Sequence, residues 1–311
     1  MGKTAFLFPG QGSQSIGMVS GIAADFPQVQ ETFAEASETL GYDLWKVADA
    51  GPDERLNSTE VTQPALLAAG IATWRVWKSL EGADPDFMAG HSLGEYTALV
   101  AAGALSFADA VALVAQRGRL MQEATPAGTG AMAAVLGLDD EVLATVCNEA
   151  AQGQVVSCAN FNSPGQVVIA GEKDAVDRAC ELATEAGARR AIPLAVSVPS
   201  HCALMKPAAE KLSAVLAEVD VETPAIPVLH NVSAQAAVDP DSIRAALYHQ
   251  LWQPVRWSET VLKLVDDGVE RFAECGPGKV LAGLNRRISR PSETAALINS
   301  DALRQTLENW S

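Results

Sequence analysis

Positive charge is scarce in this sequence. Lys and Arg together number 22 against 38 Asp and Glu, so the formal net charge is −16. Proteins that bind nucleic acid or an anionic membrane surface usually carry a basic excess. The charge balance therefore argues against both kinds of partner, although it leaves room for small local basic patches.

Cysteines and histidines are also few, and neither set has the spacing of a metal site. The five cysteines form no C-x-x-C pair and are scattered over half of the chain: Cys147, Cys158, Cys180, Cys202 and Cys275. An odd count without framework spacing predicts reduced, mostly buried thiols. There is no H-E-x-x-H motif, so we expect neither a bound metal nor a bound cofactor.

Long apolar runs are absent. The longest are interrupted by Gly, Asp or Arg well before the roughly 18 residues of a membrane-spanning helix. The first residues, MGKTAFLFPGQG, lack the apolar length and the cleavage site of a signal peptide. We therefore expect a protein without a membrane anchor and a cytoplasmic location.

What the sequence does contain is enough apolar material for a sizeable core. Of its 311 residues, 48% are hydrophobic and 19% are charged. Strand-like and helix-like segments alternate along the chain, which favours an α/β fold. The pattern predicts one long helix over 63–80, with Pro64 in its first turn, another over 106–123 capped by Ser106, and a final helix from Lys279.

The segment 130–194 has a pattern of predicted strands and helices that differs from the rest of the chain. Its predicted elements follow the order β-α-β-β-α-β, which is the ferredoxin-like arrangement, and Asn-Ser-Pro-Gly turn chemistry joins its central strands. Gly and Pro residues stand on both sides of it. We therefore expect an inserted small domain over 128–198, and a main domain made of 1–127 and 199–311.

The strongest local signal for chemistry is Gly-His-Ser-Leu-Gly at 90–94. It fits G-x-S-x-G and lies between a predicted strand over 86–90 and a predicted helix over 94–103. A serine on such a sharp turn is pushed out of the sheet, and the N–H groups that follow it can face a developing oxyanion. This context predicts that Ser92 is a nucleophile. The alternative is a chance match in a chain rich in Gly and Ala.

A serine nucleophile needs a base, and the chain has only four histidines. His91 adjoins Ser92 on the same turn, so we expect it to point elsewhere. His201 follows Val-Pro-Ser where the small domain ends, and this rigid context suits a defined imidazole; the alternative is a helix-start histidine without function. We expect His230 and His249 to be structural. No third acid is obvious, and a backbone carbonyl can also fix the tautomer of a base.

Arg117 is the most informative side chain after the serine. Its helical neighbours three and four residues away are all apolar, so it should point toward the core, whereas Arg119 should face water. A buried guanidinium is costly unless it meets an anion. That anion is either a structural Asp or Glu or the carboxylate of a substrate, and the pattern leaves both open.

The turn after the first predicted strand reads Phe-Pro-Gly-Gln-Gly-Ser-Gln over 8–14. Gly10 and Gly12 are spaced like the start of a dinucleotide fingerprint, but position 15 is Ser and no P-loop Lys follows. A nucleotide site is therefore weakly supported. The turn can instead bring a backbone N–H close to a second site, or it is an ordinary tight turn.

Taken together, these residues resemble the bacterial malonyl-CoA:acyl carrier protein transacylase family. The resemblance covers essentially the whole chain, and its seven motifs, in this order, are specific to that family. They are FPGQGSQ at 8–14, TQPAL at 62–66, GHSLGEYTAL at 90–99, QRGRLMQ at 116–122, NFNSPGQVVIAG at 160–171, SVPSHC at 197–202 and GPGKVL at 276–281.

The resemblance implies a hydrolase-like α/β core with a parallel sheet and an inserted ferredoxin-like domain. It implies that Ser92 is the nucleophile and His201 its base. It also implies that the main-chain carbonyl of Gln250 orients the histidine, which would account for the missing acid.

The remaining roles follow from the same resemblance. Gln11 and Leu93 match the oxyanion-hole donors, through their backbone N–H groups, and Arg117 matches the clamp on the malonyl carboxylate. The implied reaction transfers malonyl from malonyl-CoA to the phosphopantetheine thiol of acyl carrier protein, by a ping-pong mechanism through a malonyl-serine, to supply fatty-acid synthesis. A monomer is the expectation for this family.

Acyl carrier proteins are usually acidic, and so is this chain. Docking should therefore need clustered basic residues. The candidates are two pairs, Arg189 with Arg190 and Arg286 with Arg287. Their alternative is a pair of solvated surface patches without a partner.

Three alternative functions remain at this point. An esterase or thioesterase on the same fold would use water as the acceptor. A non-catalytic docking or scaffold subunit would keep the fold, but it has no reason to keep Ser92, His201, Arg117 and Gln11 together. A discrete acyltransferase of polyketide synthesis would use the same chemistry for another pathway.

Overall fold

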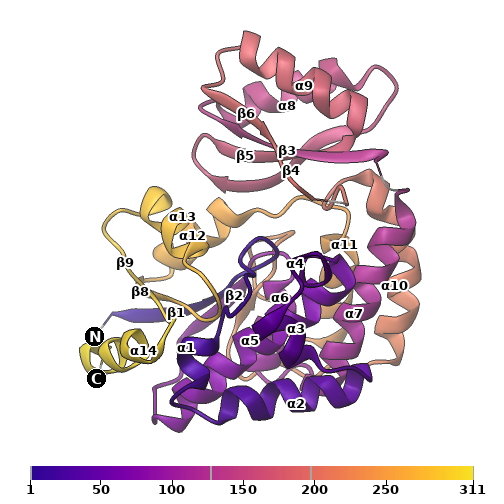
Figure 1. Ribbon diagram of the computed structural model, residues 1–311. Helices are drawn as coiled ribbons and strands as arrows, with labels where there is room; N and C mark the ends of the chain where they lie inside the picture. Colours follow the sequence, from indigo (N-terminus) through magenta and orange to yellow (C-terminus); the bar gives the residue numbers. More distant parts are fainter. Residues whose placement is uncertain (1, 127, 197, 311) are drawn as a thin grey trace.

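The structure is a computed structural model that describes residues 2–126, 128–196 and 198–310. Residue 127, where we place one domain boundary, and residue 197, the first of the SVPSHC motif, lie outside the described residues. Figure 1 shows a larger α/β body with a smaller sheet-and-helix unit standing on it. The structure confirms the α/β class, with one parallel sheet and a separate antiparallel one.

The larger body is built on a parallel sheet with the strand order β7-β2-β1-β8-β9. Its strands are β1 (Lys3–Phe8), β2 (Phe87–Gly90), β7 (Val228–Leu229), β8 (Val269–Glu274) and β9 (Glu293–Ala296). The last four residues of β1 are all buried, as expected for a parallel strand covered on both faces. Phe6 and Phe8 pack on one face, and Ala5 and Leu7 on the other.

Helices cover both faces of this sheet (Figure 1). The Phe6 face packs against the largest group, whose members are α1 (Ser20–Ala23), α2 (Gln28–Leu40), α3 (Leu44–Ala50), α4 (Asp53–Leu56), α5 (Thr59–Ser79), α6 (Gly94–Ala101), α7 (Phe107–Ala124), η1 (Ala203–Met205), α10 (Lys206–Glu218), α11 (Pro240–Gln250) and α14 (Ser300–Trp310). The Ala5 face packs against α12 (Trp257–Asp266) and α13 (Val280–Ile288).

The smaller unit is an antiparallel sheet with the strand order β4-β5-β3-β6. Its elements follow one another as β3 (Gly130–Leu136), α8 (Asp140–Ala151), β4 (Val156–Ser163), β5 (Gln166–Glu172), α9 (Lys173–Glu185) and β6 (Arg190–Pro193), the order predicted from the sequence. The two helices cover one face. The other face packs around Cys202 of the main body, so it is turned toward that body.

Two sequence predictions about the helices are wrong. Helix α5 begins at Thr59, so Pro64 lies inside the helix rather than in its first turn. The helix after Lys279 is not the last element, because β9 and α14 follow it. A four-residue edge strand such as β9 carries little pattern of its own, since it is defined by its pairing with β8. Ser106 does cap α7, accepting a hydrogen bond from the Asp109 N–H.

The thiols match their expectation in most cases. Cys147, Cys158, Cys202 and Cys275 are free and buried, and Cys180 is half-buried. Burial raises the pKa of Cys202 to about 11, so this thiol, although next to His201 in the chain, is not a ready nucleophile. Across residues 2–126, 128–196 and 198–310, no helix has the length and apolarity needed to cross a membrane.

Candidate active site

The site lies at the carboxyl ends of three neighbouring parallel strands. The register pairs Phe8 of β1 with Gly90 of β2, and Ala89 of β2 with Leu229 of β7. The loops that leave these strands therefore emerge side by side. They carry Gln11, Ser92 and Asn231 respectively, and the crevice at such strand ends is where α/β proteins bind ligands.

The turn that carries Ser92 is sharp, and its two glycines are required by close packing. Ser92 has φ 51°, which a non-glycine residue rarely adopts. A Cβ on Gly90 would lie 1.9 Å from the carbonyl carbon of Gly94, and a Cβ on Gly94 would lie 2.0 Å from the Phe8 oxygen. The two glycines of the G-x-S-x-G pattern are therefore a packing requirement of this turn.

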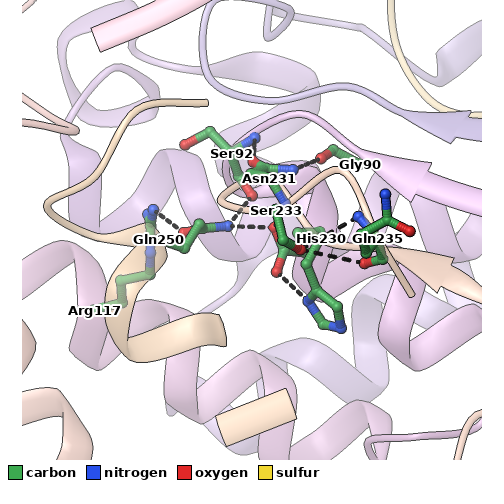
Figure 2. A network of polar contacts seen from close by, with 9 residues as sticks. Gly90, Ser92, Arg117, His230, Asn231, Ser233, Gln235 and Gln250 are labelled. Carbon is green, nitrogen blue, oxygen red and sulfur yellow. Dashed lines mark hydrogen bonds and ion pairs between the residues drawn. The ribbon is translucent and has the colours of Figure 1, made fainter. Parts of the chain in front are cut away.

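Asn231 holds this turn from the side (Figure 2). Its side-chain oxygen accepts from the Ser92 N–H over 2.7 Å, and its side-chain nitrogen donates to the Gly90 oxygen over 2.6 Å. One amide thus bridges the two ends of the strained turn. Asn231 also uses up the Ser92 N–H, which is no longer free to bind a ligand.

The nucleophile candidate and the base candidate meet directly. Ser92 Oγ lies 2.7 Å from His201 Nε2, and His201 Nδ1 lies 2.7 Å from the main-chain oxygen of Gln250. A carbonyl oxygen only accepts, so Nδ1 carries the ring proton and Nε2 has a free lone pair for the Ser92 hydroxyl. The imidazole is therefore set to accept the serine proton, with no carboxylate behind it.

His201 is held in its neutral form. It is 2% exposed, and burial first, followed by the positive charge of Arg117, lowers its pKa to about 3. The hydrogen bond to Gln250 opposes this shift but does not cancel it. A neutral imidazole at physiological pH is the form that a general base needs.

Arg117 is buried and Arg119 is exposed, as the helical spacing predicts. Arg117 donates through Nη1 to Gln63 Oε1 over 2.8 Å and through Nη2 to Gln250 Oε1 over 3.0 Å. Both acceptors are neutral amides. Figure 2 shows the second of these contacts, with the guanidinium beside the Gln250 side chain.

No carboxylate of the described residues forms an ion pair with Arg117. Burial lowers the pKa of Arg117 and raises that of Tyr96, whose ring faces the guanidinium, to about 12. Of the two anions that the sequence left open for Arg117, a directly paired structural Asp or Glu is therefore not found. The guanidinium can offer a paired fork to an external carboxylate.

A cavity of about 290 Å³ joins these groups. One side of it contains Gln11, Ser92, Arg117 and His201, and the small sheet contributes both polar and apolar residues to the rest, the polar ones being Asn160, Asn162 and Gln166. The apolar residues include Met132, Ala134, Val168, Leu194, Val196 and Val198. A ligand in it would have an anionic group near Arg117 and would extend along this mixed lining.

Gln11 and Leu93, whose backbone N–H groups are the oxyanion-hole candidates, both line this cavity. Within the described part of the chain, neither donates a hydrogen bond to another protein group. Gly10 allows the Gln11 loop to approach, because a Cβ there would lie 2.3 Å from the His91 oxygen. The loop after β1 thus packs directly on the turn of the serine. No nucleotide-type fingerprint is needed to explain its glycines.

The four arginines considered for docking are exposed, Arg189 and Arg190 at the start of β6 and Arg286 and Arg287 in the last turn of α13. Leu136 of β3 pairs with Gln166 of β5 on one side and with Arg190 of β6 on the other. Arg287, in the last turn of α13, donates to the Gln166 side chain, which also lines the cavity. Arg287 thus contacts a residue of the cavity lining, and Arg190 lies two strands away from that residue in the same sheet.

Sequence reasoning missed three residues of the site: Gln63, Glu95 and Asn231. Gln63 lies in the TQPAL motif and Glu95 in the GHSLGEYTAL motif, but their contacts join them to residues far along the chain. His230, expected to be structural, binds Glu95. His91, expected to point away from Ser92, bonds with Asn162 of the small sheet and also lines the cavity.

Metal binding finds no support in the described residues, where no group of three His, Cys, Asp or Glu side chains could hold an ion. His201, the candidate base, is committed through both ring nitrogens to Ser92 and Gln250. The chemistry that these groups can perform is acyl transfer to and from a serine.

Known proteins with the same architecture fit this chemistry. A family model described as an acyl transferase domain matches residues 5–300. The malonyl CoA-acyl carrier protein transacylase of Escherichia coli K12 is 56% identical over 308 residues, which cover 99% of this chain and all of that one.

Solved structures agree. An acyl carrier protein S-malonyltransferase from Vibrio cholerae superposes with a TM-score of 0.96 at 57% identity, covering 98% of this chain and 99% of that one. A malonyl-transacylase in complex with its type II PKS acyl-carrier protein superposes with a TM-score of 0.98 at 55% identity, covering 99% of each chain. This chain therefore belongs to the acyl transferase family, among the malonyl CoA-acyl carrier protein transacylases.

Proposed function

We propose that this protein transfers the malonyl group of malonyl-CoA to the phosphopantetheine thiol of acyl carrier protein, through a malonyl ester on Ser92. One observation carries the proposal: a serine–histidine pair shares a cavity with a buried arginine whose described partners are neutral amides. The serine pair suits acyl transfer, and the arginine suits an acyl group that ends in a carboxylate.

In the first half-reaction, the malonyl carboxylate binds the Arg117 guanidinium and places the thioester carbonyl at Ser92. His201 Nε2 takes the hydroxyl proton while Ser92 Oγ forms a bond to the carbonyl carbon. When the carbon–sulfur bond breaks, His201 returns this proton to the departing sulfur of CoA. Gln250 keeps the imidazole in the required tautomer throughout, through the bond from Nδ1.

The tetrahedral oxyanion is held by the backbone N–H groups of Gln11 and Leu93. Their position at the cavity and their lack of protein acceptors support this role, as does the use of the Ser92 N–H by Asn231. Donors already aimed at the developing charge need no reorganisation during the reaction, and one such donor is typically worth about 3–4 kcal/mol.

In the second half-reaction, the phosphopantetheine thiol replaces CoA in the cavity. His201 takes the thiol proton, the sulfur attacks the ester carbonyl, and Ser92 Oγ leaves with the proton returned by His201. The mixed lining suits the pantetheine arm, because Asn160, Asn162 and Gln166 can bond its amides and the apolar residues can pack on its methylenes. An arm that fills the cavity would displace water from the ester. This favours transfer over hydrolysis, and the product supplies fatty-acid synthesis; a polyketide pathway would use the same product.

Acyl carrier protein binds, in this proposal, at the cavity rim through the arginine pairs Arg189–Arg190 and Arg286–Arg287. Their exposure and the contact of Arg287 with Gln166, a residue of the cavity lining, support the assignment. A local basic rim compensates for a chain whose net charge is −16 and which would otherwise repel an acidic partner.

The domain assignment is part of the same proposal. We assign 128–198 to a ferredoxin-like small domain, supported by the element order and the strand order β4-β5-β3-β6. We assign 1–127 and 199–311 to a hydrolase-like catalytic domain, supported by a serine turn that follows a parallel strand. Substrate then enters between the two domains.

Steady-state kinetics with malonyl-CoA and phosphopantetheinylated acyl carrier protein test this function. Double-reciprocal plots at several carrier concentrations should give parallel lines, as in a ping-pong reaction. The Ser92→Ala variant should form no malonyl-carrier product. Release of free malonate at the same rate with and without the carrier would instead identify a thioesterase, and no turnover of either kind would favour a scaffold.

A further inference from the structure

A second layer of buried polar groups lies beneath the serine turn (Figure 2). At its centre is Glu95, in the first turn of α6 and fully buried. Its Oε1 lies 2.7 Å from His230 Nδ1. Its Oε2 accepts from the Asn231 backbone N–H over 2.9 Å and from Gln250 Nε2 over 3.2 Å. Both oxygens of the carboxylate are thus occupied.

Two of these partners lead directly to the reacting groups. Asn231 bridges the Ser92 N–H and the Gly90 oxygen. Gln250 donates from Nε2 to the Ser92 oxygen over 2.7 Å, and its main-chain oxygen accepts from His201. Glu95 therefore contacts both residues that fix the serine turn and its base, although it does not line the cavity itself.

Gln250 also connects Glu95 with Arg117. Its side-chain oxygen faces the guanidinium and its side-chain nitrogen faces the carboxylate, so the amide dipole is aligned between a cation and an anion. Burial lowers the pKa of Arg117, and Tyr96 and, to a smaller extent, Glu95 act in the opposite direction. The buried guanidinium thus has an anion near it without a direct ion pair, and its Nε has no hydrogen-bond partner among the described residues.

We propose that Glu95 is a positioning residue for malonyl transfer, one that holds Asn231 and Gln250 and, through them, the Ser92 turn, the His201 ring and the Arg117 guanidinium. This inference rests on the function proposed above. The serine and histidine have no carboxylate directly behind them. In this proposal the carboxylate of Glu95 lies one layer below them and orients the reacting groups without touching substrate.

The chemistry of Glu95 makes the inference testable. Its two oxygens accept from three donors, and glutamine in its place would offer one oxygen and add two N–H donors. With the amide nitrogen toward Asn231 and Gln250, these two donors would face a donor. With it toward His230, the ring would have to move its proton to Nε2, and in either orientation the negative charge of residue 95 is lost. Small displacements of reacting groups, of about 1 Å, can cost a hundredfold in rate. We expect a loss in the chemical step rather than in substrate binding.

The experiment compares Glu95→Gln with the matched control Glu274→Gln. Glu274 is the other fully buried carboxylate among the described residues, and it accepts from the Ala282 N–H in β8–α13 packing. Both variants remove one buried charge. The readouts are kcat and KM for malonyl-CoA, and the rate at which phenylmethylsulfonyl fluoride, which needs no carboxylate clamp, modifies Ser92.

We expect Glu95→Gln to lower kcat at least tenfold, keep KM within about threefold and slow sulfonylation by a similar factor as kcat, since the loss is in orientation. Glu95→Asp, which keeps the charge, should recover part of the loss. Glu274→Gln should lose thermal stability but keep kcat within about twofold. If Glu95→Gln does not fold, Asn231→Ala should still show the kcat loss with a kept KM.

Equal kcat values for Glu95→Gln and Glu274→Gln, after matching for folded protein, would overturn the inference. So would a loss confined to KM, or a wild-type kcat in Asn231→Ala. A failure of the proposed function has a different signature, because wild-type protein would then form no malonyl adduct while its Ser92 still reacts with the sulfonyl fluoride.

Discussion

Arg117 donates through Nη2 to the side-chain oxygen of Gln250 over 3.0 Å. The main-chain oxygen of the same glutamine accepts from His201 over 2.7 Å. One residue therefore connects the group suited to a carboxylate with the group suited to a serine proton. In the proposed function, recognition of malonyl and activation of the nucleophile are mechanically linked through Gln250.

The first prediction concerns acyl selectivity. Arg117→Ala should lower malonyl transfer about 100-fold or more, because a site built around a buried cation loses its only clamp on the malonyl carboxylate. Acetyl transfer should be kept or raised, since the variant no longer buries an unpaired charge beside an uncharged acyl group. Parallel assays with malonyl-CoA and acetyl-CoA measure the ratio.

Arg119→Ala is the matched control, because Arg119 lies on the same helix but is exposed. It should leave both rates near those of the wild type. Equal losses for malonyl and acetyl in Arg117→Ala would contradict the clamp and leave Arg117 with a structural role.

A second prediction concerns pH. His201 can act as a base only while it is neutral, and its pKa is about 3. The titration of His201 should therefore not change the rate of Ser92 sulfonylation between pH 7 and pH 5. The positive charge of Arg117 contributes to this low pKa, after burial. Arg117→Gln should therefore raise the pKa of His201, and the rate should begin to fall at a higher pH as protons block Nε2.

The pH profile uses phenylmethylsulfonyl fluoride because it needs no malonyl clamp, so the variant and the wild type can be compared directly. A wild-type rate that halves near pH 6.5, the ordinary value for histidine, would contradict the neutral buried base. An unchanged profile in Arg117→Gln would remove the electrostatic link between the two residues.

The third prediction concerns the packing of the serine turn. Gly94→Ala places a Cβ 2.0 Å from the Phe8 oxygen, so the backbone must move. Overpacking of this kind typically costs about 1–3 kcal/mol, and urea unfolding measures it. Acylation of Ser92 should fall as well, because the turn and the Leu93 N–H move together.

Gly283→Ala serves as the comparison, since a Cβ at Gly283 in α13 meets nothing within 4 Å. Replacing a helical glycine by alanine there should be neutral or stabilising by up to about 1 kcal/mol. Equal stabilities for the two variants would show that the flanking glycine of the turn is not a packing requirement.

The fourth prediction concerns the carrier protein. Arg286→Glu combined with Arg287→Glu should raise the KM for acyl carrier protein and leave acylation by malonyl-CoA unchanged, because the charge reversal affects docking and not chemistry. Adding salt should weaken wild-type docking in the same direction. Initial rates at varied carrier concentration measure both effects.

A double variant of two distant exposed arginines, Arg55→Glu with Arg304→Glu, makes the same change in net charge elsewhere. It should raise this KM much less. If both double variants behave alike, the effect belongs to net charge, and the proposed docking at the cavity rim fails.

Helical periodicity was sufficient to predict the burial of Arg117 and the exposure of Arg119, because each position depends on residues within four places along the chain. The sharp turn at Ser92 was equally predictable from the sequence, since the glycines that it requires lie within two residues of the serine. Gln63 and Asn231 were not, because their contacts span 54 and 139 residues and amides have no spacing signature.

The role of Glu95 could not be predicted either, because it also depends on contacts between residues that are distant in the sequence. Glu95 lies within the GHSLGEYTAL motif, yet its role depends on His230 and Gln250, which are distant in the sequence and come close to it only in the folded protein. β9 and α14 were missed for a related reason, since β9 is a short strand formed by pairing with β8. Local patterns predict elements and single sites, whereas networks depend on tertiary contacts.

The proposed reaction requires a malonyl ester on Ser92 that persists until a thiol acceptor reacts with it. Intact-mass measurement within seconds of mixing with malonyl-CoA tests it most directly, with acetyl-CoA in a parallel sample. We expect a malonyl adduct on Ser92, little acetyl adduct, and loss of the malonyl adduct when phosphopantetheinylated acyl carrier protein is added. An adduct that decays equally fast without the carrier, or no adduct from either donor, would contradict the proposed reaction.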